Sequence, residues 1–169
     1  MQPYFVIDIE AFSGHIIKEV GISSPHFTLG FSFLPPTTFT SLPTGRQNQN
    51  NWLTRNLHGI TWESGTIPFT ELSKLLSLFN NPNIPIYVKG LNKIQALTQY
   101  LPGVTFLNLD DISCPKYEDL LKFPGMVTCG CFSYSQAHNS IIYGNHCAQK
   151  KAQVYSSWLS FRFQNIHDE

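Results

Sequence analysis

The segment that most constrains the fold is the apolar run YFVIDI at residues 4–9, almost at the start of the chain. Nearly continuous apolar sequence over the length of a strand is typical of a strand buried on both faces, as in the middle of a layered α/β sheet. A strand with one solvated face would instead alternate apolar and polar residues. We therefore expect this run to be a central strand.

The rest of the chain predicts strands and helices in a definite order. After a turn at Gly14, residues 15–23 and 26–36 indicate two further strands, which together with the first form an antiparallel meander. Residues 84–90 and 104–111 indicate later strands, separated by a helix over 91–101. Helices are also predicted at 51–60, 67–81, 114–123 and from Asn145 onward, whereas the polar stretch 36–50 is expected to be an exposed loop. This order predicts one α/β domain over residues 1–169, with a mixed sheet flanked by helices.

Charge and composition limit the partners and the compartment. The formal net charge is zero, so any binding of nucleic acid has to come from a local basic patch. The N-terminal apolar run is broken by acids, which argues against a signal peptide, and no stretch approaches the ~18 apolar residues of a membrane span. We expect an intracellular protein, cytoplasmic or nuclear, with no membrane partner. In such a reducing compartment the four cysteines favour thiol or metal chemistry over disulfides.

Asp8 and Glu10 interrupt the first strand. Because they are two residues apart, their side chains lie on one face of it. Two carboxylates on one buried face repel each other and are costly to desolvate, and a pair of divalent cations would offset that cost, as in two-metal nucleases. The alternative is that the strand frays after Ile7 and both acids are solvated. The residues alone leave both interpretations open.

This N-terminal pattern, the meander and the later alternation of strands and helices resemble the ribonuclease H-like 3′–5′ exonucleases. That resemblance implies a ribonuclease H-like fold, with Asp8, Glu10 and His146 as catalytic positions, because HCAQKKA matches the frame of the family's last motif. Lys151, however, stands where that motif has its metal-binding aspartate, and GLNKIQAL lacks the aspartate of the preceding motif. We expect a degenerate nuclease with little or no two-metal catalysis.

The second group of candidate residues is rich in cysteine and histidine. Cys129, Cys131, His138 and the pair His146-Cys147 have spacings compatible with a tetrahedral zinc site that ties a loop to the start of a helix. The alternative is that the cysteines are small, buried packing groups.

These residues resemble the Maelstrom domain, itself an exonuclease fold without catalytic acids, and HCA opening the last helix and the segment KEVGIS carry the likeness. The resemblance implies structural zinc held by Glu19, Cys131, His138 and Cys147. The family's first cysteine precedes its histidine by three residues, and that position here is Ser135, so Cys131 serves only if the loop is rearranged. His146 is the alternative fourth ligand.

Three functions remain open. The first is binding of single-stranded RNA or DNA through Lys89, Lys93, Lys150 and Lys151, which the Maelstrom resemblance would place with silencing-pathway proteins in small-RNA (piRNA) silencing of transposons. A solvated helix face is the plainer explanation of these lysines. The second is an active Mg²⁺- or Mn²⁺-dependent exonuclease that adds Asp110 or Asp111 to the acid pair. The third is a protein-interaction scaffold. Its surface would be formed by three aromatic residues, Trp52, Trp62 and Phe69.

Overall fold

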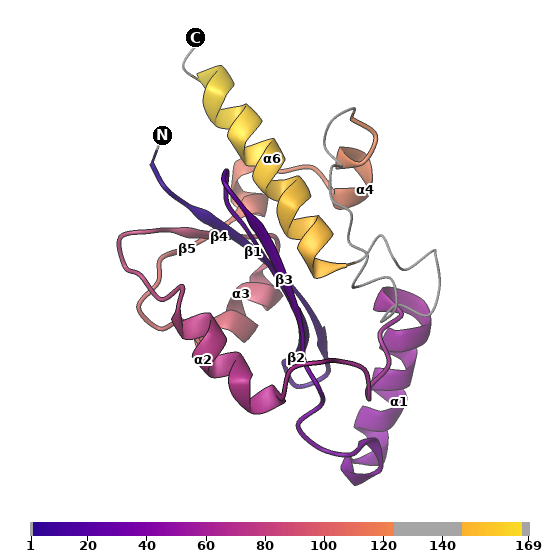
Figure 1. Ribbon diagram of the computed structural model, residues 1–169. Helices are drawn as coiled ribbons and strands as arrows, with labels where there is room; N and C mark the ends of the chain where they lie inside the picture. Colours follow the sequence, from indigo (N-terminus) through magenta and orange to yellow (C-terminus); the bar gives the residue numbers. More distant parts are fainter. Residues whose placement is uncertain (1, 124–146, 167–169) are drawn as a thin grey trace.

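The structure is a computed structural model, and it describes residues 2–123 and 147–166. Five strands form one sheet, flanked by helices on both faces (Figure 1). The strands are β1 (Phe5–Phe12), β2 (Ile16–Ser23), β3 (Thr28–Ser32), β4 (Ile86–Val88) and β5 (Phe106–Asn108). The helices are α1 (Thr44–Leu53), α2 (Leu72–Ser77), α3 (Leu91–Thr98), α4 (Tyr117–Leu120) and α6 (Ala148–Ile166).

The sheet is mixed and has the strand order β3-β2-β1-β4-β5. β1 pairs antiparallel with β2, and β2 with β3, so the predicted N-terminal meander is confirmed. β4 lies parallel to β1 on its other side, and β5 parallel to β4. The run at residues 4–9 is therefore part of the central strand, as predicted. Fraying after Ile7 was the wrong alternative, because β1 continues to Phe12.

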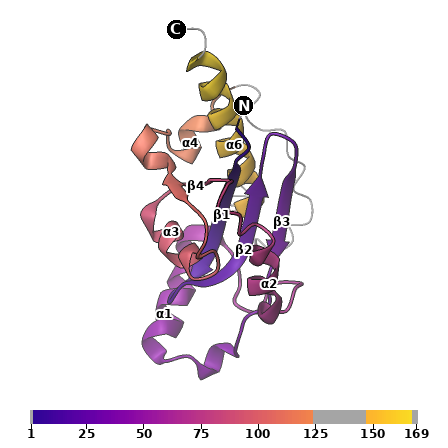
Figure 2. The same cartoon turned by 90° about the vertical axis from the view of Figure 1, so that its left-hand side faces the viewer.

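Helices cover the two faces of the sheet unequally. The 19-residue helix α6 crosses the face formed by β1, β2 and β3, with α4 beside it (Figure 1). Helices α2 and α3 lie on the opposite face, and the view turned by 90° separates them from α6 across the sheet (Figure 2). The side chains of β1 that point to α2 and α3, such as Ile7 and Ile9, belong to the larger apolar core. Tyr4 and Val6 on the other face pack in a smaller core with Val154 and Leu159 of α6.

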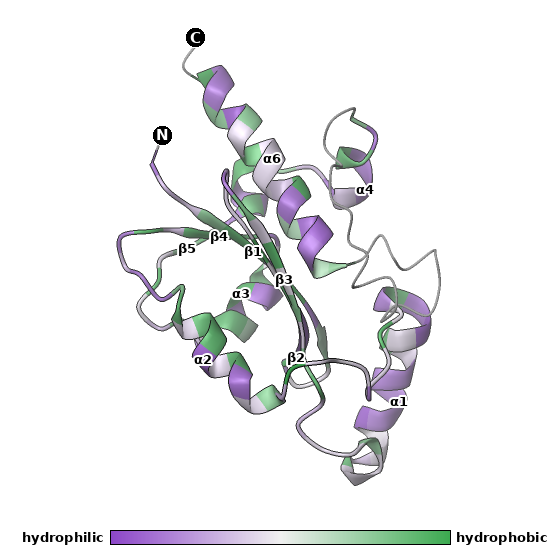
Figure 3. Cartoon of the chain, in the orientation of Figure 1, coloured by the Kyte–Doolittle hydropathy of each residue, from purple (hydrophilic) through white to green (hydrophobic). Residues whose placement is uncertain are grey.

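The predicted loop over residues 36–50 is partly wrong, because α1 begins at Thr44 and runs through the segment taken as loop. Its polar character is real, and Figure 3 shows hydrophilic colours along most of α1. The helix is anchored instead by a buried asparagine: Asn50 Oδ1 accepts hydrogen bonds from the backbone N–H of Ser13, at 3.0 Å, and from its hydroxyl, at 2.7 Å. A π-helical turn, Thr54–His58, extends α1, and Gly59 ends it in a left-handed conformation (φ 71°).

The predicted strand over 104–111 is shorter than expected. The side chain of Asn108 accepts the backbone N–H of Asp110 at 3.0 Å, which ends the strand and starts a 3-10 turn over Leu109–Ile112. Among the helices that the structure describes, none has the length and apolar character needed to cross a bilayer.

Candidate functional site

Three acidic side chains gather where α6 begins, on the face of the sheet that this helix covers. The register pairs Asp8 with Gly21 and Glu10 with Glu19, so β1 and β2 bring the three carboxyl groups together. All three residues are buried, with Asp8 and Glu19 fully excluded from solvent. A β-bulge follows directly after Glu10 and shifts the pairing of the rest of the hairpin. Such an accumulation of buried acid needs compensating charge or hydrogen bonds.

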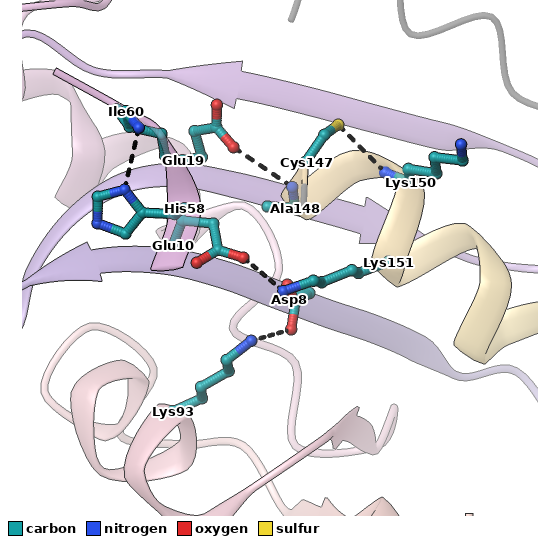
Figure 4. A network of polar contacts seen from close by, with 10 residues as sticks. All are labelled: Asp8, Glu10, Glu19, His58, Ile60, Lys93, Cys147, Ala148, Lys150 and Lys151. Carbon is teal, nitrogen blue, oxygen red and sulfur yellow. Dashed lines mark hydrogen bonds and ion pairs between the residues drawn. The ribbon is translucent and has the colours of Figure 1, made fainter. Parts of the chain in front are cut away.

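Two lysines supply that compensation at the β1 acids. The ammonium group of Lys93, from α3, lies 2.6 Å from Asp8 Oδ1, and that of Lys151, from α6, lies 2.7 Å from Glu10 Oε1 (Figure 4). The Lys151–Glu10 pair is buried, with the two side chains 12% and 6% exposed, respectively. Lys151 also lies 5.8 Å from the ring centroid of Tyr117, close enough for a cation–π contact. The other oxygen of Asp8, Oδ2, is buried and has no hydrogen-bond partner among the described residues.

The two acids respond in opposite directions to this setting. Burial raises the pKa of Asp8, and the charges of Lys93 and Lys151 offset only part of that rise. Burial acts in the same sense on Glu10, but Lys151 and Lys93 outweigh it and hold the pKa of Glu10 below its usual range. Burial would lower the pKa of Lys151, and the acids beside it overcome that effect and raise it. Glu10 and Lys151 are therefore an ionised pair at neutral pH.

The third acid, Glu19, faces the N-terminus of α6. Its Oε2 accepts the backbone N–H of Ala148 at 3.3 Å, and the positive end of the helix dipole favours a carboxylate there. The close approach of helix and sheet depends on Gly21, because a Cβ at that position would lie 2.1 Å from the carbonyl oxygen of Ala148. The sulfur of Cys147, also buried, accepts the backbone N–H of Lys150 at 3.4 Å.

This corner contains two of the four residues predicted to hold zinc. Glu19 and Cys147 are both buried, and the carboxylate contacts the residue that follows the cysteine (Figure 4). A carboxylate and a thiolate are suitable zinc ligands, so these two residues fit the predicted set. Cys131 and His138 lie outside the described residues, as does His146. Within residues 2–123 and 147–166, no group of three or more histidine, cysteine or acidic side chains is arranged to hold a metal.

The remaining predicted lysines have distinct surroundings. Lys89 follows β4 and donates hydrogen bonds to Asp110 Oδ1 and, at 2.6 Å, to the carbonyl oxygen of Cys114. It therefore braces the turn after β5. Lys150 lies on α6 beside Lys151 and is half-buried. Asp111 is exposed in the same 3-10 turn as Asp110.

His58 is a member of the site that the sequence did not reveal. It is buried, its ring meets Phe12 edge-on with centroids 4.9 Å apart, and its Nδ1 accepts the backbone N–H of Ile60 at 3.1 Å. Figure 4 shows the ring next to Glu10. The π-helical turn that ends at His58 is of a kind often found at functional sites, but nothing in the sequence marks it.

The aromatic surface expected for a protein-interaction scaffold is not continuous. Trp62 is buried: its ring packs against Phe12 and its indole N–H donates to the carbonyl oxygen of Thr37 at 2.9 Å. Phe69 packs against the main core, and Trp52 is 58% exposed. The prediction that the three residues form one docking surface is therefore wrong.

Comparisons with protein-family models, with curated proteins and with solved structures found no match to this chain.

The chemistry available at the acid cluster follows from its charge balance. Two-metal catalysis needs carboxylates that are free to bind divalent cations. Here an ammonium group lies within hydrogen-bond distance of each β1 acid, where it competes with a cation both for the oxygen and for the space. The cluster is thus built as a set of internal ion pairs.

Proposed function

We propose that this chain is a ribonuclease H-like domain, similar to the Maelstrom domain, that has lost two-metal catalysis and binds single-stranded RNA. The observation that carries the loss of catalysis is the pair of ammonium contacts to buried acids, Lys93 to Asp8 and Lys151 to Glu10. The strand order, with an antiparallel meander followed by two parallel strands on the other side of β1, supports the fold assignment. The choice of RNA, and a role in small-RNA silencing of transposons, come from the family resemblance.

In this proposal, lysines take over the charge that metal ions supply in an active nuclease. In an active nuclease, metal ions neutralise both the acids and the phosphates at the scissile bond. In this chain ammonium groups neutralise the acids, so the backbone of a bound strand meets a site without a nucleophile-activating metal. Lys151 reaches a phosphate only by leaving Glu10. Binding through a few such contacts is weak and sensitive to salt, with each released counterion adding roughly 0.7 to the single-strand salt slope.

Structural zinc is the second part of the proposal. Glu19 and Cys147, buried together at the start of α6, are half of the ligand set, and Cys131 and His138 complete it. Zinc so bound supplies folding energy and no catalysis. Through these ligands, the bound zinc would hold the first turn of α6 against β2, where Gly21 leaves room for the helix backbone.

The direct test incubates the protein with end-labelled single-stranded RNA and Mg²⁺, and follows both binding and strand length. We expect a retarded complex that weakens as salt rises, with the RNA at full length. Shortening of the RNA that disappears in Asp8→Asn would overturn the loss of catalysis and favour the exonuclease alternative. Absence of a complex at low salt would overturn RNA binding and favour a protein-interaction role.

A further inference from the structure

A groove of about 650 Å³ lies between α6 and the turn that joins β2 to β3. It is separate from the acid cluster, since it follows the C-terminal two thirds of α6, and the tip of the β2–β3 hairpin lies beside that part of the helix (Figure 1). Its size is within the range of about 300–1,000 Å³ common for small-molecule sites. It belongs to no function described above.

The α6 wall of the groove is polar and uncharged. Gln153, Ser157, Ser160 and Gln164 line it at intervals of three and four residues, so they occupy one face of the helix. Amide and hydroxyl groups both donate and accept hydrogen bonds. Among the described residues that line the groove, none is a lysine, arginine, aspartate or glutamate. The groove therefore suits a neutral ligand with several polar atoms along its edge.

One phenylalanine ring adds flat apolar surface to this polar lining. Phe161, from α6, is 59% exposed. Phe27 contributes to the hairpin side of the groove, but its ring packs 6.0 Å from that of Phe5, in the core that α2 covers on the other face of the sheet. Exposed aromatic rings next to hydrogen-bonding groups are the features that bind unpaired bases in single-stranded nucleic acids.

A lysine lies at the N-terminal end of this polar face of α6. Lys150 lies one helical turn before Gln153, on the same face of α6. We propose that the groove binds an unpaired nucleobase of single-stranded RNA, with the base stacked on Phe161, its edge bonded to the amides and hydroxyls of α6, and a neighbouring phosphate at Lys150. This inference rests on the proposed function and names where the bases are bound. An uncharged sugar would also bond to the hydroxyls, but it would make no use of Lys150.

The test is fluorescence anisotropy with a labelled oligouridine at low salt and without Mg²⁺. Phe161→Ala is expected to raise the dissociation constant roughly 5- to 100-fold, the cost of losing one stacked base. Phe123→Ala is the matched control, because Phe123 is 56% exposed and does not line the groove. Its affinity should equal that of the wild type. Circular dichroism confirms that both variants are folded.

A second ligand separates base recognition from backbone binding. The wild type should bind an abasic strand of the same length about as weakly as Phe161→Ala binds the intact strand. If the wild type binds RNA and Phe161→Ala does not weaken that binding, the groove assignment is wrong and the proposed function stands. If the wild type binds no single-stranded RNA, both fail. Binding of an oligosaccharide in the groove, shown by chemical-shift changes at Ser157 and Gln164, would likewise overturn the assignment of the groove to a nucleobase.

Discussion

Replacing Lys151 by methionine tests whether Glu10 depends on its ammonium partner. Methionine keeps most of the length and apolar contact of the lysine stem but removes the charge 2.7 Å from Glu10 Oε1. The glutamate, only 6% exposed at its side chain, is then left without its nearest cation. We expect a large loss of stability, measured as the free energy of unfolding in urea.

The magnitude follows from what the buried carboxylate can do. Removing one partner of a buried ion pair costs about 3–5 kcal/mol. The variant can limit this cost by protonating Glu10, whose ordinary pKa is 4.5. At neutral pH, protonating Glu10 means overcoming about 2.5 pH units at about 1.4 kcal/mol each, which is about 3.5 kcal/mol. Lys93 still acts on Glu10, so we expect a loss of about 3 kcal/mol.

The pH dependence gives this prediction a second, independent readout. In the wild type the pKa of Glu10 is lowered on folding, so its contribution to stability is present above pH 4.5 and is lost as the pH falls. In Lys151→Met the pKa of Glu10 is raised on folding, so stability is greatest below its ordinary value and falls as the pH rises. The difference between variant and wild type should therefore shrink steadily from neutral pH toward acid.

Two further variants serve as controls. Lys122→Met removes the lysine of a pair that has the same 2.7 Å separation from Asp119 but side chains 73% and 52% exposed, and it should change little. The double variant Glu10→Gln/Lys151→Met removes both charges and should recover at least half of the loss. If Lys151→Met costs under about 1 kcal/mol at neutral pH and does not change the pH slope, the buried pair is not what holds this site together.

Three other perturbations test the surroundings of the site. Burial raises the pKa of Asp8 above its ordinary 3.8, so ionised Asp8 costs stability as the pH rises. In urea denaturation, Asp8→Asn should therefore match the wild type in acid and be more stable than the wild type at neutral pH. A variant less stable than the wild type at neutral pH would refute this. Cys147→Ala should lose bound zinc and lower the melting temperature, whereas Cys114→Ala should keep its metal; equal metal content in both would reject the zinc ligand. Gly21→Ala should abolish or strongly weaken folding, because its Cβ would meet the backbone of Ala148. Gly45→Ala, in open space within α1, should instead stabilise the protein by about 0.5–1 kcal/mol. Thermal melts that rank the two variants in the opposite order would show that α6 does not pack closely on β2.

The strands were predictable because their signal is local. The apolar run at residues 4–9 and the two-residue spacing of Asp8 and Glu10 fix both the central strand and the shared face of the acids. The first two turns of α1 were not, because residues 44–51 are polar and their anchor, Asn50, bonds to a turn 37 residues away. Hydrophobic periodicity carries no information about such a contact.

The sequence could not reveal which lysines pair with the acids, because these contacts also join residues that are far apart in the chain. Lys93 is separated from Asp8 by 85 residues, and Lys151 from Glu10 by 141. The match to the last exonuclease motif predicted that Lys151 lies near Asp8 and Glu10 and contacts a phosphate. In the structure α6 packs on β1 so that the ammonium group of Lys151 contacts Glu10. Trp62 gave the opposite error: its sequence context is polar, yet Phe12 and Phe39 pack around its ring and bury it.

A Mn²⁺ titration followed by electron paramagnetic resonance measures whether lysines take the place of metal ions at the β1 acids. The wild type and Glu10→Gln should leave the same signal of free Mn²⁺, since neither offers an available carboxylate pair. Stoichiometric uptake of Mn²⁺ by the wild type that is lost in Glu10→Gln would show instead that the β1 acids bind metal.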